Sequence, residues 1–462
     1  MDSNIKQLKN NFDKSFLAKV FIIAVPIIIQ NTITNLAGLL DNVMVGMIGT
    51  DQMNGVSVVN QLNFVYNLCV WGSICGAGIF TAQFYGRSDH QGVRYTFRAK
   101  IFLALLISVF IAVVYFFAGD FLINLFLHKT DNIGNPELTL LYGKNYLRIC
   151  LIGFFPFSIA MSYSNTLRGI GETRIPMIGG IIGVAVNVCL NYILIFGKLG
   201  VPELGVEGAA VATVVSRFCE MFFIVAYTHI KKNRFEFIQG AFKSLKIPFD
   251  LLKKILIKGT PLAANECLWA LGLTFLNQTY SFRGLAVVGA LNITSTITNL
   301  FNVFLFAMGE SISIIVGQLL GAGKKDESKS TALKLIFLSA STCVLVALVL
   351  FLCRNFFPGI YNTEAEVKIL ASKFISVAAC IMPVNAIVHC CYFTLRCGGK
   401  TFITFLFDSL FVWAVLVPLS FCLVHFTSLE ILIVYAIVAS SDILKAVIGV
   451  ILVNRGIWIQ QL

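Results

Sequence analysis

The sequence TLRGIGET occupies residues 166–173, and a second version of it, TLRCGGKT, occupies residues 394–401, which lie 228 positions later. Pro26 and Pro261 form another pair, with an offset of 235 positions. Two well-separated pairs with nearly equal offsets indicate an internal duplication whose halves differ by a few residues of loop. The offset of 235 is shared by three more pairs: Asn42 and Asn277, Gln83 and Gln318, and Gly86 and Gly321.

The amino-acid composition of this duplicated chain is that of a membrane protein. Of the 462 residues, 57% are hydrophobic and only 13% are charged, whereas about 25% are charged in a soluble domain. The mean hydropathy is +0.84. A soluble protein with this composition would lack a polar surface, which excludes a cytosolic enzyme, a secreted disulfide scaffold and a disordered chain.

Apolar runs long enough to cross a bilayer fill both halves of the chain. A span needs about 20 apolar residues, and backbone groups in lipid must be hydrogen-bonded within the segment, so each span is expected to be helical. We predict about twelve transmembrane helices, the third of which is interrupted near Gly119. Their approximate ranges are 17–46, 52–84, 97–127, 138–167, 175–196, 206–230, 251–280, 286–320, 331–353, 367–395, 402–424 and 429–453.

Basic residues are concentrated in the loops on one side of the predicted spans. The net charge is +12, yet the loops after the first, fifth, seventh and eleventh spans hold few Lys or Arg residues. The positive-inside rule therefore places both termini and the basic segment 231–250 in the cytoplasm. We interpret the charge as a topology signal in a multi-pass protein of the cell membrane, and we predict no nucleic-acid partner.

The two halves are expected to have the same orientation, because each begins and ends on the cytoplasmic side. We predict an all-α polytopic membrane protein with an N-terminal lobe at 1–230, a cytoplasmic linker at 231–250 and a C-terminal lobe at 251–462. A pseudo-two-fold axis along the membrane normal is expected to relate the two six-helix lobes. Internal repeats with a cleft between them are typical of secondary transporters.

Several motifs occur in a fixed order along the chain: LLDNVMVG at 39–46, the TLR repeat, NVCLNYILIFG at 187–197 and GVEGAAVAT at 205–213. Together they cover nearly the whole chain and resemble the MATE family (multidrug and toxic compound extrusion). The resemblance implies two lobes around a central cavity. It also implies export of organic, often cationic and amphipathic compounds, driven by the inward flow of H⁺ or Na⁺.

Asp41 is a carboxylate at the predicted depth of the membrane in the first span. An acidic residue there costs about 2.5–3.5 kcal/mol on insertion scales, which favours a functional role. Because burial favours the neutral carboxyl group, we predict that Asp41 exchanges a proton. Thr34 shares its helix face and is a candidate for the substrate cavity. The resemblance assigns proton or sodium coupling to an acidic residue of the N-terminal lobe.

Asn187 and Asn191 lie one turn apart in the fifth span and face the same way. The resemblance implies polar residues at both positions near the acidic residue and matches the NorM-like branch; some other branches have Asp at the second position. We predict that both asparagines take part in cation coupling, with Asp41 and Asn187 as the ligands if the ion is Na⁺. The alternative is that they form interhelical hydrogen bonds only.

The NorM-like branch also implies a sodium site in the C-terminal lobe, but this chain lacks its ligands. The Glu, Asp and Tyr of that site correspond to Trp269, Asn385 and Ile381 here. Because Na⁺ prefers hard oxygen ligands, we do not expect the same site, and we favour H⁺ over Na⁺ as the coupling ion. Glu266, three residues before Trp269 on nearly the same helix face, is the candidate to replace the missing acid.

Further residues are candidates for the wall of the substrate cavity. Glu310 and Asp408 are acidic residues within spans, and each could attract a cationic substrate or pair with a neighbouring helix. Trp269 and Tyr280 could stack on a cation, and Asn385 is a polar residue in the tenth span.

Opposite charges recur three residues apart in the sixth and twelfth spans, as Arg217 with Glu220 and as Asp442 with Lys445. Each pair is predicted to share one helix face. The 13 cysteines lie almost all in apolar runs without metal-ligand spacing, so we predict neither a metal centre nor a cofactor beyond the coupling ion. Catalytic and nucleotide-binding motifs are missing from the sequence, and we predict that the protein is not an enzyme.

The leading hypothesis is a monomeric, lipid-embedded antiporter that exports amphipathic organic compounds by alternating access. The alternative is a flippase for lipid-linked precursors from the same superfamily, which would line its cavity with several basic residues. Basic residues at membrane depth are few, chiefly Arg217 and Lys445, and each has an acidic neighbour in the sequence. This pattern favours the antiporter.

Overall fold

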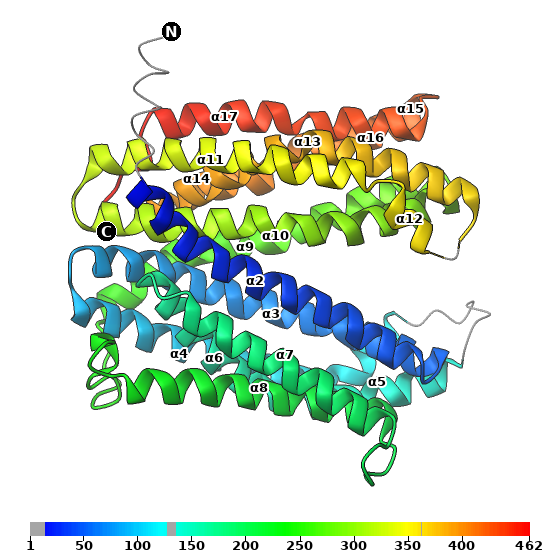
Figure 1. Cartoon of the computed structure of the whole chain (residues 1–462), viewed down its shortest axis with the longest axis horizontal. Helices are drawn as coiled ribbons and strands as arrows, with labels where there is room; N and C mark the ends of the chain where they lie inside the picture. The colour runs from blue at the N-terminus through cyan, green and yellow to red at the C-terminus, as the bar shows by residue number, and fades with distance from the viewer. Residues whose placement is uncertain (1–13, 127–134, 362) are drawn as a thin grey trace. The chain divides into compact units, whose positions relative to one another are not determined.

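The computed structural model describes residues 14–126, 135–361 and 363–462, and helices make up nearly all of these ranges. The first half contains α2 (Lys14–Gly46), α3 (Thr50–Gly86), α4 (His90–Asn124), α5 (Pro136–Cys150), η1 (Leu151–Gly153), α6 (Phe154–Gly169), α7 (Arg174–Ile195) and α8 (Gly205–Ile230), followed by η2 (Glu236–Ile238). The second half contains α9 (Phe249–Ser281), α10 (Leu285–Gly321), α11 (Lys325–Leu352), α12 (Phe356–Ile360), α13 (Ala365–Cys397), α14 (Thr401–Phe405), η3 (Leu406–Leu410), η4 (Val412–Leu416), α15 (Val417–Phe426), α16 (Ile431–Ser440) and α17 (Asp442–Asn454) (Figure 1).

Eleven helical segments within the described ranges are long and apolar enough to cross a membrane. The remaining long helix, α9, has 33 residues. Its first three turns carry Lys253, Lys254 and Lys258, which lower its hydropathy. With α9 included, the prediction of about twelve spans in an all-α membrane protein is confirmed.

The helix boundaries repeat with the offset that the sequence predicted. The helices α2 and α9 each have 33 residues, and α3 and α10 each have 37 residues. Starts and ends of these helices are 235 positions apart, like the proline pair. The duplication is therefore present in the structure of the helices as well as in the sequence.

The expected interruption near Gly119 is wrong, because α4 continues through that residue to Asn124. A Cβ atom on Gly119 would lie 2.9 Å from a side-chain carbon of Leu147, so the glycine allows close helix packing rather than a break. Irregular turns occur elsewhere. The fourth span contains the 3₁₀ turn η1, and the eleventh contains the two π-helical segments η3 and η4. Such π-helical turns are often found at functional sites.

The described chain forms two compact units, which we call unit 1 and unit 2. Unit 1 comprises residues 14–28, 82–88 and 257–462, and unit 2 comprises 29–81 and 89–256. The helices α2 and α3 each contribute residues to both units. The lobe boundaries at 230 and 250, the two-fold axis and the central cavity stay predictions.

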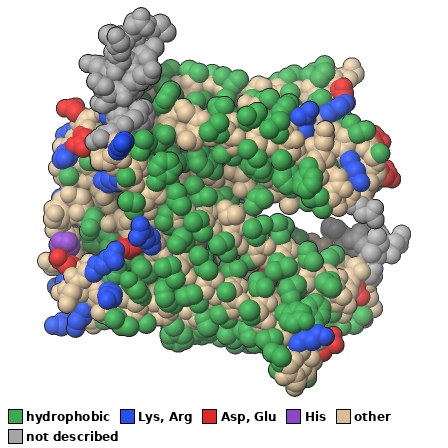
Figure 2. Space-filling view, in the orientation of Figure 1, with side chains coloured by type: hydrophobic (Ala, Val, Ile, Leu, Met, Phe, Trp, Pro, Cys, Tyr) green, Lys and Arg blue, Asp and Glu red, His purple; other side chains and the backbone are tan. Residues whose placement is uncertain are grey.

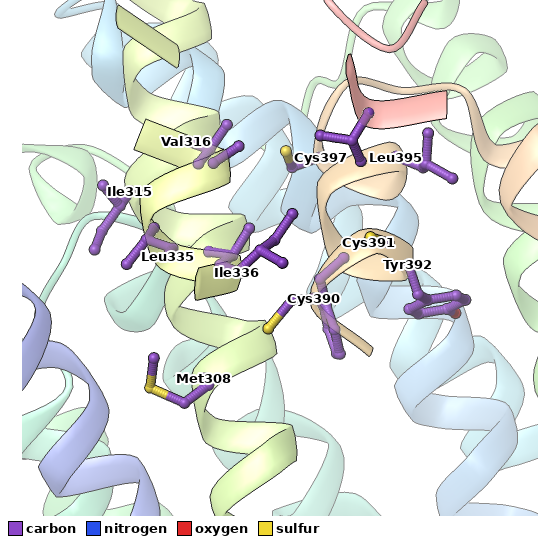
Figure 3. Packing of buried hydrophobic residues seen from close by; sticks show 14 of the residues in the cluster. Met308, Ile315, Val316, Leu335, Ile336, Cys390, Cys391, Tyr392, Leu395 and Cys397 are labelled. Atoms are coloured by element: carbon purple, nitrogen blue, oxygen red, sulfur yellow. The ribbon is translucent and has the colours of Figure 1, made fainter. Parts of the chain in front are cut away.

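The core of unit 1 is built mainly from α10, α11 and α13, with the beginning of α2 packed against them. Figure 3 shows Ile315 and Val316 of α10, Leu335 and Ile336 of α11, and Cys390 of α13 within this cluster. The cysteines of α13 act here as small apolar residues. Burial of apolar side chains between helices fixes which faces of α10, α11 and α13 meet.

Apolar side chains also cover the outside of both units. On the visible face they cover the middle of the helices, whereas charged side chains gather towards the helix ends (Figure 2). Phe117 of α4 and Leu352 of α11 are 80% and 68% exposed. A soluble surface rarely exposes apolar side chains over so large an area, and lipid is the solvent that suits it.

Gly86 and Gly321 allow the ends of α3 and α10 to come into backbone contact within unit 1. A Cβ atom on Gly86 would overlap the carbonyl group of Gln318, and one on Gly321 would overlap the carbonyl group of Gln83. The contact is reciprocal and joins two pairs of positions that have the same offset of 235 in the duplication.

We expect Gly86→Ala to lower the free energy of unfolding by about 1–3 kcal/mol, the usual cost of overpacking. The added methyl group meets backbone atoms of another helix, which cannot rotate away. Thermal unfolding of the purified protein measures the effect. Gly359→Ala in α12 is the matched control, since a Cβ atom there has open space around it. Equal melting temperatures for the two variants would contradict the packing argument.

The predicted linker is folded onto α4 by a buried arginine of unit 2. Arg98 donates hydrogen bonds to the carbonyl oxygens of Ala241 at 2.6 Å, Lys246 at 3.0 Å and Gly240 at 3.1 Å. Phe237 of η2 is buried beside it, with 1% of its surface exposed. Arg98 thus provides hydrogen-bond donors to three backbone carbonyl groups of the segment.

Arg98→Met is expected to make this segment more sensitive to trypsin by at least about tenfold, since the loss of even one hydrogen bond to a charged donor, about 1.5–3 kcal/mol, has that effect. Cleavage after Lys243 or Lys246, followed by mass spectrometry of the purified protein, measures the change. Arg148→Met is the control, because Arg148 is an exposed residue in the last turn of α5. Digestion at equal rates in both variants would rule out a role for Arg98 in holding the segment.

Candidate functional site

A polar cluster within unit 2 surrounds the carboxylate of Asp41 on α2. Asn191 of α7 donates a hydrogen bond from Nδ2 to Asp41 Oδ1 at 2.5 Å. When the Asn187 amide is turned so that its nitrogen faces the carboxylate, it lies 2.8 Å from Oδ1 and 3.2 Å from Oδ2. The sequence placed Asp41 on the first span and the two asparagines on the fifth, and the structure brings all three together.

The asparagines are held in place because α7 and α8 pack along their length. Asn187 and Asn191 are buried, with 7% and 1% of their surfaces exposed, whereas Asp41 is half-buried. In the opposite orientation of the Asn187 amide, its nitrogen lies 3.4 Å from the hydroxyl oxygen of Thr213 on α8 instead of facing Asp41. Asp41 therefore lies at the edge of a buried polar surface, where a small ion could reach it.

The donor set around Asp41 suits either a proton or a sodium ion. The carboxylate can accept a proton, and the buried Oδ1 of Asn191 has no hydrogen-bond partner among the residues that the structure describes. Carboxylate, amide and hydroxyl oxygens are hard ligands of the kind that alkali and alkaline-earth cations prefer. Within the described ranges there is no group of three His, Cys, Asp or Glu residues that could hold a metal ion.

A second polar cluster, within unit 1, surrounds Asp408 in the π-helical segment η3. Lys445 of α17 donates to Asp408 Oδ1 at 2.6 Å, and Asn265 of α9 donates to Oδ2 at 2.9 Å. The Asn265 side-chain oxygen in turn accepts from the Ser409 hydroxyl group at 2.7 Å. Both oxygens of the Asp408 carboxylate thus have partners from neighbouring helices.

This second cluster continues through Tyr392 of α13 to Glu266. The Tyr392 hydroxyl group donates to Glu266 Oε1 at 3.0 Å and lies 3.3 Å from the Asn265 amide nitrogen. The chain of contacts therefore connects Glu266, Tyr392, Asn265, Asp408 and Lys445 across four helical segments. Glu266, predicted to replace a missing acid, has a phenol as its neighbour.

Lys445 forms an ion pair with Asp408 of the eleventh span, while Asp442 lies three residues before it on the same helix, as the spacing predicted. In the described part of the chain, the ion pair of Lys445 is the one to Asp408, whose side chain is 16% exposed. A break at Ser441 makes Asp442 the first residue of α17, and Lys445 points towards the eleventh span. Arg217 and Glu220 lie 3.6 Å apart as predicted.

The remaining candidates differ in burial, and two of them belong to the packed core. Tyr280 is 2% exposed and packs against Tyr435 at a ring distance of 5.9 Å, inside the core of unit 1. Trp269 packs beside the same core cluster. Glu310 and Asn385 are half-buried, and Thr34 is exposed. Their roles in a substrate cavity stay predictions.

Sequence reasoning did not identify Asn265, Tyr392 or Lys100 as notable. Asn265 is adjacent to Glu266 and lies one helical turn after Pro261, and this position could have identified it as a candidate site residue. Lys100 of α4 is wholly buried, and its amine donates to Thr166 Oγ1 at 3.1 Å. It is a buried basic residue at a depth where sequence reasoning named chiefly Arg217 and Lys445, although position 100 lies within the predicted third span.

Duplicated six-span halves and carboxylates buried between membrane-spanning helices define an integral membrane protein of the transporter class. The MatE family model matches residues 26–193 and 261–422, which is more than half of the chain. The chain therefore belongs to the MatE family. The two matched regions begin at Pro26 and Pro261, the pair that first showed the duplication.

Curated relatives cover most of the chain at low identity. A probable multidrug resistance protein NorM of Thermotoga maritima is 26% identical over 439 residues, which are 94% of this chain and 92% of that protein. The multidrug resistance protein MdtK of Pectobacterium atrosepticum is 27% identical over 368 residues, covering 78% and 77% of the two chains. These names describe resistance proteins and not enzymes.

Solved structures show the same fold. A MOP superfamily transporter from Pyrococcus furiosus superposes with a TM-score of 0.84 at 19% identity, covering 95% of both chains. An outward-facing multidrug resistance MATE family transporter gives the same TM-score at 18% identity. Agreement over nearly the full length confirms the fold predicted from the sequence.

Proposed function

We propose that this protein is a cation-coupled antiporter that exports amphipathic, often cationic, organic compounds across the cell membrane. The single observation that carries the proposal is the Asp41 carboxylate, which two asparagines of α7 hold within membrane-spanning helices. A charged group at such a place is costly, so its presence favours a functional role. The names of the curated relatives support drugs as the substrate class.

Coupling requires that protonation of Asp41 changes the relative stability of two conformations. A protonated carboxyl group loses its charge and becomes a donor, so its two contacts with amide nitrogens are no longer both favourable. The hydrogen bonds between α2 and α7 then weaken, and α2 contains Pro26, where its backbone ladder lacks a donor. A ligand that binds one conformation better shifts the equilibrium towards it.

The proposed coupling ion is H⁺ rather than Na⁺. In unit 1, Lys445 neutralises Asp408, and Glu266 has Tyr392 rather than a second carboxylate beside it. This arrangement offers little negative charge for a sodium ion there. We also propose that both termini face the cytoplasm, on the basis of the distribution of Lys and Arg among the loops.

Transport in proteoliposomes with separately imposed gradients tests the proposal. Ethidium uptake or release should respond to an imposed pH gradient and remain at the background level with a sodium gradient alone. Ethidium movement with the sodium gradient alone would replace H⁺ by Na⁺ as the coupling ion. Absence of movement with either gradient, for ethidium and norfloxacin alike, would refute the antiporter.

The alternative proposal is a flippase for lipid-linked precursors, and the buried amine of Lys100 is the observation that favours it. Against it, Arg217 lies beside Glu220, and Lys445 lies beside Asp408, so acidic partners neutralise both of these cations. Phosphate groups of a lipid precursor would find few free cations. Transbilayer movement of a fluorescent isoprenoid diphosphate in the same proteoliposomes, without any ion gradient, would support the alternative.

A further inference from the structure

The side chain of Gln83, near the end of α3, connects three backbone groups of unit 1. Its Nε2 atom donates to the carbonyl oxygens of Cys397 at 3.1 Å and Gln460 at 3.2 Å. Its Oε1 atom accepts from the backbone nitrogen of Leu462 at 2.8 Å. Gln83 is wholly buried, so each of these contacts replaces water. One amide therefore uses both donor hydrogens and its acceptor on segments far apart in the sequence.

The segment that follows the last span is held at several more points. Trp458 is wholly buried and donates from Nε1 to the carbonyl oxygen of Val453 at 3.0 Å. Gln461 donates to the carbonyl oxygen of Gly321 at 3.0 Å, and Arg87 donates to that of Leu462 at 3.1 Å. Residues 458–462 thus contact the ends of α3, α10 and α13, and we call this assembly the clasp.

The clasp closes over the reciprocal helix contact at Gly86 and Gly321. That contact relates equivalent positions of the two halves, but the segment 458–462 is present once in the chain. The hydrogen bonds from Gln83 to residues 460 and 462 therefore do not follow from the duplication. Gly398 adds to the tight fit, since a Cβ atom there would overlap the carbonyl group of Trp458.

The helix α3, whose end the clasp holds, has residues in both units. Residues 82–88 belong to unit 1, whereas the preceding residues of this unbroken helix belong to unit 2. A continuous helix transmits displacement along its axis. A displacement of the part of α3 before residue 82 would therefore bend this helix or act on its end at the clasp.

We propose that the clasp holds the end of α3 against α10 and α13, and that it opens and closes during each transport cycle. Gln83 is a positioning residue in this device, not a ligand of the substrate or of the ion. The part of the proposal that concerns the cycle rests on the proposed antiport. Loss of one net hydrogen bond changes such an equilibrium by about tenfold.

The rate at which N-ethylmaleimide modifies Cys397 reports on the clasp directly. Cys397 is 2% exposed, and its own carbonyl group accepts from Gln83. Mass spectrometry resolves the modification of each cysteine in the full-length protein in membrane vesicles. Cys150, 5% exposed in unit 2, serves as the internal measure of intact folding.

Two matched pairs of variants isolate the hydrogen bonds. Gln83→Met keeps the volume but removes the amide, and Gln91→Met makes the same change at an exposed residue of α4. Leu462→Pro removes the backbone donor to Gln83, whereas Leu462→Ala shortens the side chain and keeps that donor. We expect about tenfold faster modification of Cys397 in Gln83→Met and Leu462→Pro, and rates near that of the native protein in the two controls.

The outcomes separate the clasp from the proposed function. Equal rates in Leu462→Pro and Leu462→Ala would overturn the clasp, and this comparison stands even if Gln83→Met fails to fold. In the native protein, ethidium together with a pH gradient should speed the modification of Cys397. If the variants behave as expected and the native protein transports ethidium, but ethidium does not speed the modification, the holding role is supported and the opening of the clasp in each cycle is overturned. If ethidium transport in proteoliposomes is itself absent, the proposed antiport fails and the holding role of the clasp still stands.

Discussion

Asp41→Asn is expected to abolish coupled export of ethidium while leaving the protein in the membrane. An asparagine has nearly the same shape, but it can neither carry the charge nor bind the proton of a carboxyl group. Its side-chain oxygen can still accept a hydrogen bond from Asn187 or Asn191, so the helices should remain packed. We expect the gradient-driven rate to fall by about 100-fold, near the upper end of typical coupling between two ligands.

The control for this variant removes a carboxylate that has no place in the candidate site. Asp120 at the end of α4 forms a surface ion pair with Lys144, and its side chain is 53% exposed. Asp120→Asn should transport ethidium at the native rate, since an exposed pair contributes at most about 1 kcal/mol to stability. Native rates in Asp41→Asn, measured in proteoliposomes at equal protein content, would refute the coupling role of Asp41.

Lys445→Met is expected to destabilise the protein by about 3–5 kcal/mol, the usual effect of removing one partner of a buried ion pair. The Lys445 side chain is 6% exposed, and its ammonium group lies 2.6 Å from Asp408 Oδ1. Without it, the carboxylate keeps the single hydrogen bond from Asn265 in surroundings that contain little water. Thermal unfolding of the purified protein should show the loss as a lower melting temperature.

A second substitution distinguishes electrostatics from packing at this position. Replacing both partners, as in Lys445→Met with Asp408→Asn, removes the unpaired charge and should recover most of the lost stability. If the double variant is as unstable as the single one, the loss of stability comes from the shape of the side chains, and the unpaired charge does not explain it. Lys144→Met at the exposed pair with Asp120 should change stability little.

The span pattern and the duplication were accessible from the sequence because both are properties of the linear chain. A helix in lipid needs a long apolar run whatever its neighbours are, so predicted and observed boundaries agree closely for most spans. The exception was Gly119, where glycine was interpreted as a break. Its neighbour Leu147 lies on another helix, and the sequence does not show that the missing side chain makes room for it.

The unit 2 cluster was predictable in its members but not in its geometry. A carboxylate in an apolar run and two asparagines one turn apart are visible in the sequence, and the resemblance to a known family linked them. The contact between Asn191 and Asp41 spans 150 positions. The packing of α2 against α7 determines which carboxylate oxygen of Asp41 accepts the hydrogen bond from Asn191. It also determines that the side-chain oxygen of Asn191 has no partner among the described residues.

The sequence by itself determined that this protein is a duplicated bundle of membrane-spanning helices with acidic residues in its apolar segments. Only the tertiary structure decided which cation Asp408 binds, because the choice between neighbours on different helices depends on packing and on the π-helical turns of the eleventh span. It likewise decided the environment of Gln83, whose three partners come from distant segments. Hydropathy is a local property of a segment, whereas the pairing of buried polar groups depends on the relative position of several helices at once.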